Sequence, residues 1–352
     1  MMKKILKWTG RILLCLLIVF GLLAAYYRHV TVMVLNNLLQ KHNTLQEEAW
    51  NKGNVYEKVP YAEVSASDYV DIYVPDDVEN PPLLVMVHGG GFVAGDSQSR
   101  QSQLVYQYFR EHGYAVASVN YRLAQEATFP ASVQDVKACV RFLRANAETY
   151  GYNGEQITIM GESAGGYLAV MAAVTGNVDF NDLPYIGEDL TKEQVSAEVQ
   201  GLVDYYGCVE LGNMEPDWEE ENIPGIVLKI ANYWASEELL GGYENFESRF
   251  VGRNMSQMDE EETAKYLPAY YVRKNWDKNT NVQVYISHGD SDLTVPILQS
   301  DRFYDLLKEQ IGEDRVIYHV PKKAGHAGEI MYAEKELSKV LEFMNSYTLS
   351  EE

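Results

Sequence analysis

Short, continuous apolar runs alternate with helical patterns through most of this chain, and this alternation limits the folds open to it. A continuous apolar run suits a strand that is buried on both faces of a sheet. We expect such strands at residues 82–87, 114–119, 156–160, 201–206, 281–287 and 314–320, and helices at residues 102–113, 131–151, 163–174, 301–312 and 334–347. The alternation predicts an α/β fold with a mostly parallel central sheet and helices on both faces.

Two further segments complete the predicted domain, which runs from residue 55 to residue 352. Residues 69–75, YVDIYVP, alternate apolar and polar side chains, which is typical of an antiparallel strand near the edge of a sheet. Residues 209–279 are acidic and aromatic and lie between two expected strands. We interpret this segment as a mostly helical cap inserted into the domain, and not as a separate folding unit.

The N-terminus is basic and then strongly apolar. The stretch MMKKILKWTGR is followed by an uncharged run from Ile12 to Tyr27. We interpret residues 1–29 as an uncleaved membrane anchor whose basic flank stays in the cytoplasm, which places the rest of the chain outside it. The alternative is a signal peptide, whose cleavage would make the protein secreted. Residues 30–54 would form a juxtamembrane helix or linker.

The composition excludes some partners. The formal net charge is -22 over 352 residues, so the chain should repel polyphosphate and is not expected to bind nucleic acid. The three cysteines, Cys15, Cys139 and Cys208, have neither metal-ligand spacing nor a C-x-x-C pattern. We expect no metal and no cofactor. The sequence predicts no particular oligomeric state.

The most informative motif is GESAG, residues 161–165, which fits the pattern G-x-S-x-G. Alone it is weak, because the pattern arises by chance in glycine-rich chains. Here it follows an expected strand and opens an expected helix, which is the arrangement that a nucleophile elbow requires. The glycines would let the strand and the helix approach closely around a strained serine. We therefore expect Ser163 to be a nucleophile.

A serine that attacks a carbonyl also needs N–H donors for the oxyanion that develops. The stretch HGGGF, residues 88–92, follows the strand expected at 82–87. Its three glycines allow a tight turn with exposed N–H groups. We expect the amides of Gly90, Gly91 and Ala164 to form the oxyanion hole. Phosphate binding is the weaker interpretation, because the chain has no G-x-G-x-x-G motif and no Walker lysine here.

The serine further needs a base, and the base needs an orienting carboxylate. His326 lies in AGHAGE, a loop between the last expected strand and the last expected helix, where the chain order Ser, acid, His places the base. His88 and His288 each end an apolar strand, and we expect them to brace loop backbones. For the carboxylate, the loop HGDSD offers both Asp290 and Asp292.

Taken in order, HGGGF, NYRLAQEATFP, GESAGG, HGDSDLTVP and AGHAGE resemble the motifs of the α/β-hydrolase fold. The resemblance is to the carboxylesterases with an HGGG loop, which include hormone-sensitive-lipase-like and acetyl-esterase or feruloyl-esterase-like branches. It implies Ser163 as nucleophile, His326 as base and Asp292 as acid. Asn120 and Gln125 stand where the family often has Asp and Pro, so we expect a change in loop detail without loss of activity.

The resemblance implies a serine hydrolase that cleaves carboxylic esters of short acyl groups through an acyl-enzyme. The triad does not itself choose esters over amides, so a peptidase or amidase on the same fold is an alternative. A second alternative is a catalytically silent, membrane-tethered protein whose aromatic cap binds carbohydrate. The simpler interpretation of the cap aromatics is that they bury apolar area.

Overall fold

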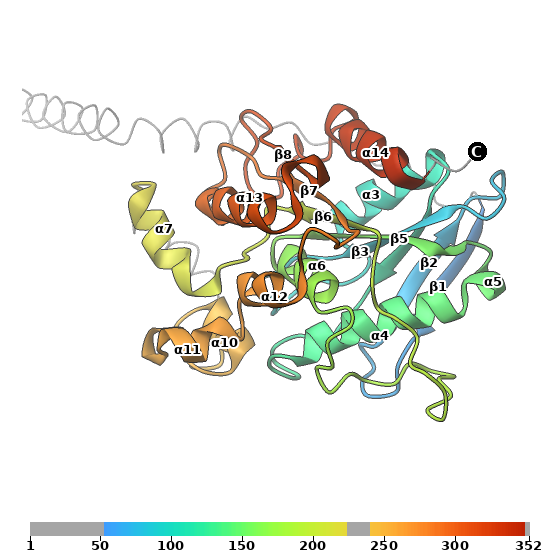
Figure 1. The fold of residues 1–352 in the computed structure, drawn as a ribbon, viewed down its shortest axis with the longest axis horizontal. Coiled ribbons are helices and arrows are strands. Elements are labelled where there is room, and N and C mark those ends of the chain that lie inside the picture. The colour runs from blue at the N-terminus through green and yellow to red at the C-terminus, as the bar shows by residue number, and fades with distance from the viewer. Residues whose placement is uncertain (1–52, 224–239, 349–352) are drawn as a thin grey trace, which may run out of the picture.

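A computed structural model describes residues 53–223 and 240–348 of the chain (Figure 1). The predicted anchor at 1–29, nearly all of the predicted linker and part of the cap lie outside the described residues. Within the two described ranges, no helix combines the length and the apolar character that crossing a bilayer requires.

The centre of the protein is one eight-stranded sheet in the order β1-β2-β4-β3-β5-β6-β7-β8. The strands are β1 (Asn54–Pro60), β2 (Tyr69–Val74), β3 (Pro82–Val87), β4 (Ala115–Val119), β5 (Asn153–Glu162), β6 (Gly201–Tyr205), β7 (Gln283–Ser287) and β8 (Val316–His319). β2 pairs antiparallel with β1 and β4, and all other pairings are parallel. The predicted mostly parallel sheet is confirmed, and the carboxyl ends of its parallel strands meet at one edge.

Helices cover both faces of this sheet, as predicted. One face carries α3 (Arg100–Glu111) and α14 (Glu334–Thr348), which lie side by side (Figure 1); the other carries α4 (Ala131–Ala145), α6 (Ala164–Val174), α12 (Pro268–Asn275) and α13 (Leu298–Ile311), with the short α5 (Ala147–Tyr150) following α4. Side chains of a strand alternate between faces. Leu84 and Met86 of β3 therefore join the core with α3, while Leu83 and Val85 join the core with α4 and α6.

The cap is helical where the structure describes it. Its elements are short: α7 (Met214–Glu220), α10 (Phe246–Val251) and α11 (Glu260–Ala264), with 3-10 turns at Leu211–Asn213 and Met255–Gln257. They lie together at one end of the molecule, on the left in Figure 1. The last helix before β7, α12, packs instead on α6 and α13 of the main body.

Strand β2 differs from its expected environment. It is antiparallel as predicted, but β1 lies outside it, and residues 70–74 are all buried. The polar position Asp71 therefore does not face solvent. Its carboxylate accepts hydrogen bonds from the backbone N–H of Lys58 (2.7 Å) and from Gln98 Nε2 (2.8 Å). The polar residue in this alternating pattern is therefore buried and hydrogen-bonded inside the protein, and the pattern does not mark a solvent-exposed face of the strand.

Candidate active site

The turn between β5 and α6 holds Ser163 in a conformation that few residues adopt. Its backbone φ is +54° and its ψ is -123°, outside the regions that L-residues ordinarily populate. The flanking glycines make the turn possible. A Cβ on Gly161 would lie 2.0 Å from the carbonyl oxygen of Gly165, and a Cβ on Gly165 would lie 2.2 Å from that of Val87. The predicted elbow is therefore built by close backbone packing.

The structure brings the predicted base to this serine. His326, in the loop between β8 and α14, places its Nε2 atom 3.0 Å from Ser163 Oγ. Its other ring nitrogen, Nδ1, lies 2.7 Å from Oδ2 of Asp292. With Nδ1–H donating to the carboxylate, Nε2 is left as an acceptor for the serine proton. Three residues from three different loops thus form one continuous hydrogen-bonded chain.

The loop after β7 distinguishes the two candidate carboxylates. Asp292 is almost fully buried, and its Oδ1 accepts hydrogen bonds from the backbone N–H groups of Thr294 (2.8 Å) and Val295 (3.0 Å). Burial opposes its ionisation, but His326 and His288 outweigh burial and hold the pKa of Asp292 well below its usual range.

Asp290 has a different role in that loop. Its Oδ1 accepts a hydrogen bond from the backbone N–H of Lys323 at 2.6 Å, so it links the loop after β7 to the loop that carries His326. Lys322 Nζ lies 3.5 Å from its other carboxylate oxygen. Asp290 therefore orients a loop, and Asp292 alone of the pair contacts the histidine.

The two strand-end histidines lie in structural positions. His88 Nδ1 lies 2.8 Å from the carbonyl oxygen of Gly89, its ring stacks on Tyr121, and burial lowers its pKa to about 4. His288 Nδ1 lies 2.7 Å from Ser300 Oγ, and its Nε2 lies 3.0 Å from the carbonyl oxygen of Val295.

His288 also contacts Asp292, the predicted acid. Its Nε2 lies 3.3 Å from Oδ2 of Asp292. Burial works against protonation of this ring, but the hydrogen bond and the charge of Asp292 outweigh burial and raise the pKa of His288. His288 therefore braces both the loop and Asp292, and the sequence did not predict its contact with Asp292.

The glycine loop after β3 presents the predicted oxyanion donors. The N–H of Gly89 donates to Glu162 Oε1 at 3.3 Å and is therefore engaged. Gly90 (φ +121°) and Gly91 (φ +60°) adopt conformations that favour glycine. In the part of the chain that the structure describes, no acceptor takes the N–H of Gly90, Gly91 or Ala164. All three residues line the cavity that contains Ser163.

The segment after β4 supports this glycine loop. The N–H of Ala124 donates to the carbonyl oxygen of Phe92 (2.8 Å), and Gln125 Nε2 donates to that of Val93 (2.7 Å). Gln125, where the family often has Pro, thus adds a hydrogen bond to the loop. Asn120, where the family often has Asp, donates from Nδ2 to the carbonyl oxygen of Ser67 at 2.9 Å.

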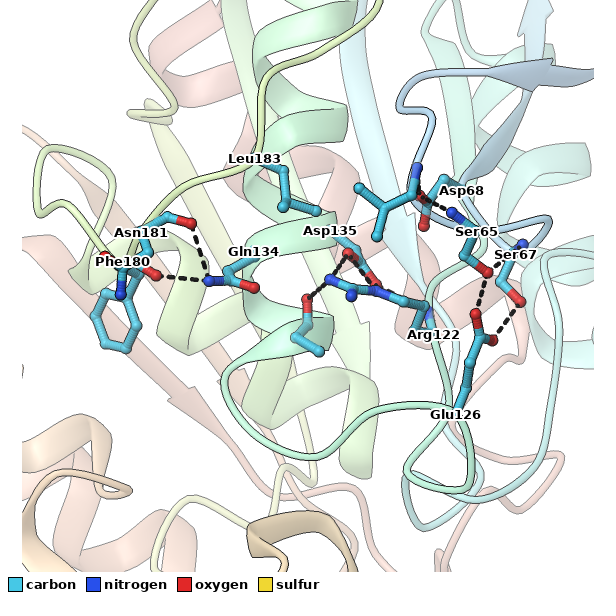
Figure 2. Close-up of polar contacts among 12 residues, drawn as sticks. Ser65, Ser67, Asp68, Arg122, Glu126, Gln134, Asp135, Phe180, Asn181 and Leu183 are labelled. Carbon is cyan, nitrogen blue, oxygen red and sulfur yellow. Dashed lines mark hydrogen bonds and ion pairs between the residues drawn. The ribbon is translucent and has the colours of Figure 1, made fainter.

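A buried ion pair fixes the same segment on α4. Figure 2 shows Arg122 lying along Asp135, with Arg122 Nη2 2.6 Å from Asp135 Oδ1. Burial raises the pKa of Asp135 to about 6 in spite of this partner. On the other side, Glu126 accepts hydrogen bonds from Ser65 and Ser67 of the loop between β1 and β2 (Figure 2). These contacts tie the loop beneath the oxyanion donors to the body of the fold.

A cluster of buried polar groups that the sequence did not predict lies behind Ser163. Glu162 is buried and accepts hydrogen bonds from the hydroxyl groups of Tyr206 (2.9 Å) and Tyr332. Burial raises the pKa of Glu162 against these hydrogen bonds. The ring of Tyr206 packs edge-on against His326, with centroids 4.8 Å apart. The cluster therefore connects the glycine loop, through Gly89, to His326. Its one sequence signal was a charged residue inside GESAG.

The cavity above Ser163 has a volume of about 400 Å³. The main body contributes the glycine loop, Ser163, His326 and Tyr206, and the cap contributes Met214, Phe246 and Glu247. Within the described residues, no group of three His, Cys, Asp or Glu side chains is arranged to hold a metal ion. The arrangement suits proton transfer from a serine hydroxyl to histidine, with amide donors for a developing negative charge.

The topology and this site define an α/β hydrolase, and comparisons with known proteins agree with that class. The BD-FAE family model matches residues 70–307, more than half of the chain, so the chain belongs to the BD-FAE family. The predicted α/β-hydrolase fold and the predicted resemblance to esterases of this fold are both confirmed.

Individual relatives are distant. The chain is 23% identical to the probable carboxylic ester hydrolase LipM of Mycobacterium tuberculosis, over 78% of this chain and 56% of LipM. It is 26% identical to the esterase LipC of the same organism, over 71% of this chain and 54% of LipC. The chain thus spans about half the length of the curated relatives it matches. Among solved structures, a carbohydrate esterase from gut microbiota, in truncated form, superposes with a TM-score of 0.67 at 22% identity, covering 86% of this chain and 99% of the other.

Proposed function

We propose that this protein is a serine hydrolase that cleaves carboxylic esters with short acyl groups. The observation that carries the proposal is the hydrogen-bonded chain from Ser163 Oγ through His326 to Asp292, at 3.0 Å and 2.7 Å. Beside it lie amide donors that no acceptor takes within the described residues. The names of the curated relatives, carboxylic ester hydrolase and esterase, support the reaction class. A cavity of about 400 Å³ supports small acyl groups.

The proposed mechanism has two acyl-transfer steps. His326 Nε2 takes the hydroxyl proton as Ser163 Oγ attacks the ester carbonyl carbon, and Asp292 stabilises the imidazolium that forms. The amides of Gly90, Gly91 and Ala164 donate to the oxyanion. The imidazolium then protonates the departing alkoxide, leaving an acyl group on Ser163. Water, losing its proton to His326, then attacks the acyl carbon. The bond from that carbon to Ser163 Oγ breaks, the acid leaves, and His326 returns the proton to Ser163 Oγ.

The test compares ester and amide substrates in wild type and in Ser163→Ala. We expect hydrolysis of p-nitrophenyl acetate and butyrate, slower hydrolysis of long-chain esters, and little cleavage of peptide anilides. The Ser163→Ala variant should lose about 10⁶-fold in kcat, the scale of removing a serine nucleophile. Efficient anilide cleavage without ester cleavage would establish the peptidase or amidase alternative. Equal activity in wild type and Ser163→Ala would establish the catalytically silent binding protein.

We further propose that residues 1–29 anchor the protein in a membrane with its catalytic domain outside the cytoplasm. The support is the basic stretch followed by the apolar run in the sequence. Esterase activity should sediment with membranes and be released by detergent but not by high salt. A shortened protein found in the culture medium, separate from the cells, would instead support signal cleavage.

A further inference from the structure

Glu247 is a buried carboxylic acid that lines the same cavity as Ser163 and His326. It belongs to α10 of the cap, and only 9% of its surface is exposed. Within the described parts of the chain, no other residue donates a hydrogen bond to its carboxyl group or forms an ion pair with it. Its own backbone N–H donates a hydrogen bond to the carboxyl group. The proposed mechanism does not use this group.

Such a group is costly to the fold. A carboxyl group that is this buried loses much of its hydration, and no other described residue replaces that hydration with a hydrogen bond. Its neighbours in the cavity include the apolar side chains of Met214 and Phe246 and the thiol of Cys208. The titratable groups that face it are Cys208, Glu215 of α7 and Glu244 before α10, so the nearby carboxylates add repulsion. Burial, with these carboxylates, raises the pKa of Glu247 to about 7.

The position of Glu247 relative to the reacting atoms is fixed by its neighbours. Asn245 caps α10 by accepting a hydrogen bond from the N–H of Ser248 at 2.9 Å. The adjacent Phe246 packs on the oxyanion loop, so close that a Cβ on Gly91 would lie 3.3 Å from its ring. The helix that carries Glu247 is therefore held against the donors that would bind the substrate carbonyl.

We propose that Glu247 is a specificity-determining residue that accepts a hydrogen bond from a donor group on the substrate, a hydroxyl or an ammonium, next to the scissile ester. This inference rests on the proposed esterase function. The carboxyl group that lacks a partner in the protein obtains one from the ligand. Esters that carry such a donor are bound better than esters of the same shape without one, because the unpaired carboxyl penalises the latter.

The test uses matched substrates at about pH 8, above the pKa of about 7. On the acyl side these are the p-nitrophenyl esters of butyrate, 3-hydroxybutyrate and 3-aminobutyrate. On the alcohol side they are butyl, 3-hydroxybutyl and 3-aminobutyl acetate. Comparing the hydroxyl and amino members identifies the donor, and comparing the two sets identifies the side of the ester. Each is measured with wild type, Glu247→Leu and the control Glu215→Gln, which removes an exposed nearby charge.

In wild type, at least one donor-bearing ester should exceed its unsubstituted counterpart by about 10-fold in kcat/KM, through KM, the scale of a hydrogen bond to a charged group. In Glu247→Leu that ratio should fall to about one or below, while hydrolysis of butyrate is retained or improved. Glu215→Gln should keep the wild-type ratio.

Two results would overturn the inference while leaving the esterase function intact. One is butyrate hydrolysis by wild type with no preference for any donor-bearing ester, and the other is a preference that survives in Glu247→Leu. If wild type hydrolyses no ester at all, the proposed function itself is wrong and the inference falls with it. Thermal unfolding of both variants checks folding. Glu247→Leu should be at least as stable as wild type at this pH, because it removes a buried carboxylate and loses only the hydrogen bond from the residue's own backbone N–H.

Discussion

The replacement Asp292→Asn tests the hydrogen-bond geometry of the site with almost no change of shape. One carboxylate oxygen of Asp292, Oδ1, accepts from the N–H groups of Thr294 and Val295, and the other faces His326. An asparagine must keep its carbonyl oxygen toward the two backbone donors. Its NH₂ group therefore takes the place of Oδ2 and donates to Nδ1 of His326.

That donation forces the wrong tautomer of the base. With Nδ1 accepting, the ring proton moves to Nε2, and the atom 3.0 Å from Ser163 Oγ can no longer accept the serine proton. Loss of the correct tautomer in a triad of this type lowers kcat by about 10⁴-fold, which corresponds to about 5.5 kcal/mol of barrier. We expect a loss of this size in kcat for p-nitrophenyl acetate, with KM little changed.

The matched control is Asp290→Asn, two residues away in the same loop. Asp290 accepts from the N–H of Lys323, which an asparagine oxygen can also do, so this variant should keep kcat within about 10-fold, the cost of at most one weakened hydrogen bond. The comparison uses steady-state kcat and KM values for p-nitrophenyl acetate, measured on both purified variants. Circular dichroism confirms that both are folded. Equal losses in the two variants, or a folded Asp292→Asn protein with near wild-type kcat, would refute the reasoning.

Three further outcomes follow from buried contacts. Gly165→Ala should cost at least about 3 kcal/mol of unfolding free energy, because its Cβ would lie 2.2 Å from a backbone oxygen. The control Gly187→Ala has open space around its Cβ and should cost about 1 kcal/mol, for its positive φ alone. Arg122→Met should cost about 3–5 kcal/mol by leaving Asp135 buried and unpaired, and adding Asp135→Leu should recover much of it. The pKa of Glu247 is raised in the folded protein to about 7 from an ordinary 4.5, so wild type loses stability as the pH rises between these two values. Glu247→Leu does not titrate there, and its gain in unfolding free energy over wild type should therefore grow by up to about 3 kcal/mol across this range. Denaturant unfolding measures all three, and a pH-independent gain, a harmless Gly165→Ala or an undamaged Arg122→Met would contradict the respective packing argument.

Much of the site was predictable because parallel strands end at one edge of a sheet. Ser163, His326 and the HGDSD loop each follow an expected strand. These three segments come together at that edge once the strands are in the correct order. The choice between Asp290 and Asp292 was not decided by the residues alone. It depends on the path of the loop between β7 and α13, where two carboxylates two positions apart meet different partners: Asp290 meets the N–H of Lys323, and Asp292 meets His326.

Other parts depended on contacts that no local pattern encodes. The burial of β2 follows from β1 packing outside it, and the pairing of Glu162 with Tyr332 joins residues 170 positions apart. Glu247 lies in a cap of short helices with little periodicity, and its place in the cavity depends on Phe246 docking against Gly91. Such long-range contacts emerge only when the chain is folded.

The most direct test of the central claim is covalent labelling of the nucleophile. Purified protein is titrated with a fluorophosphonate, and the modified residue is identified by peptide mass spectrometry while p-nitrophenyl acetate hydrolysis is measured in parallel. We predict one adduct, on Ser163, with activity falling in proportion to labelling and no adduct in Ser163→Ala. An adduct on another residue, or hydrolysis that persists when Ser163 is fully modified, would contradict the assignment.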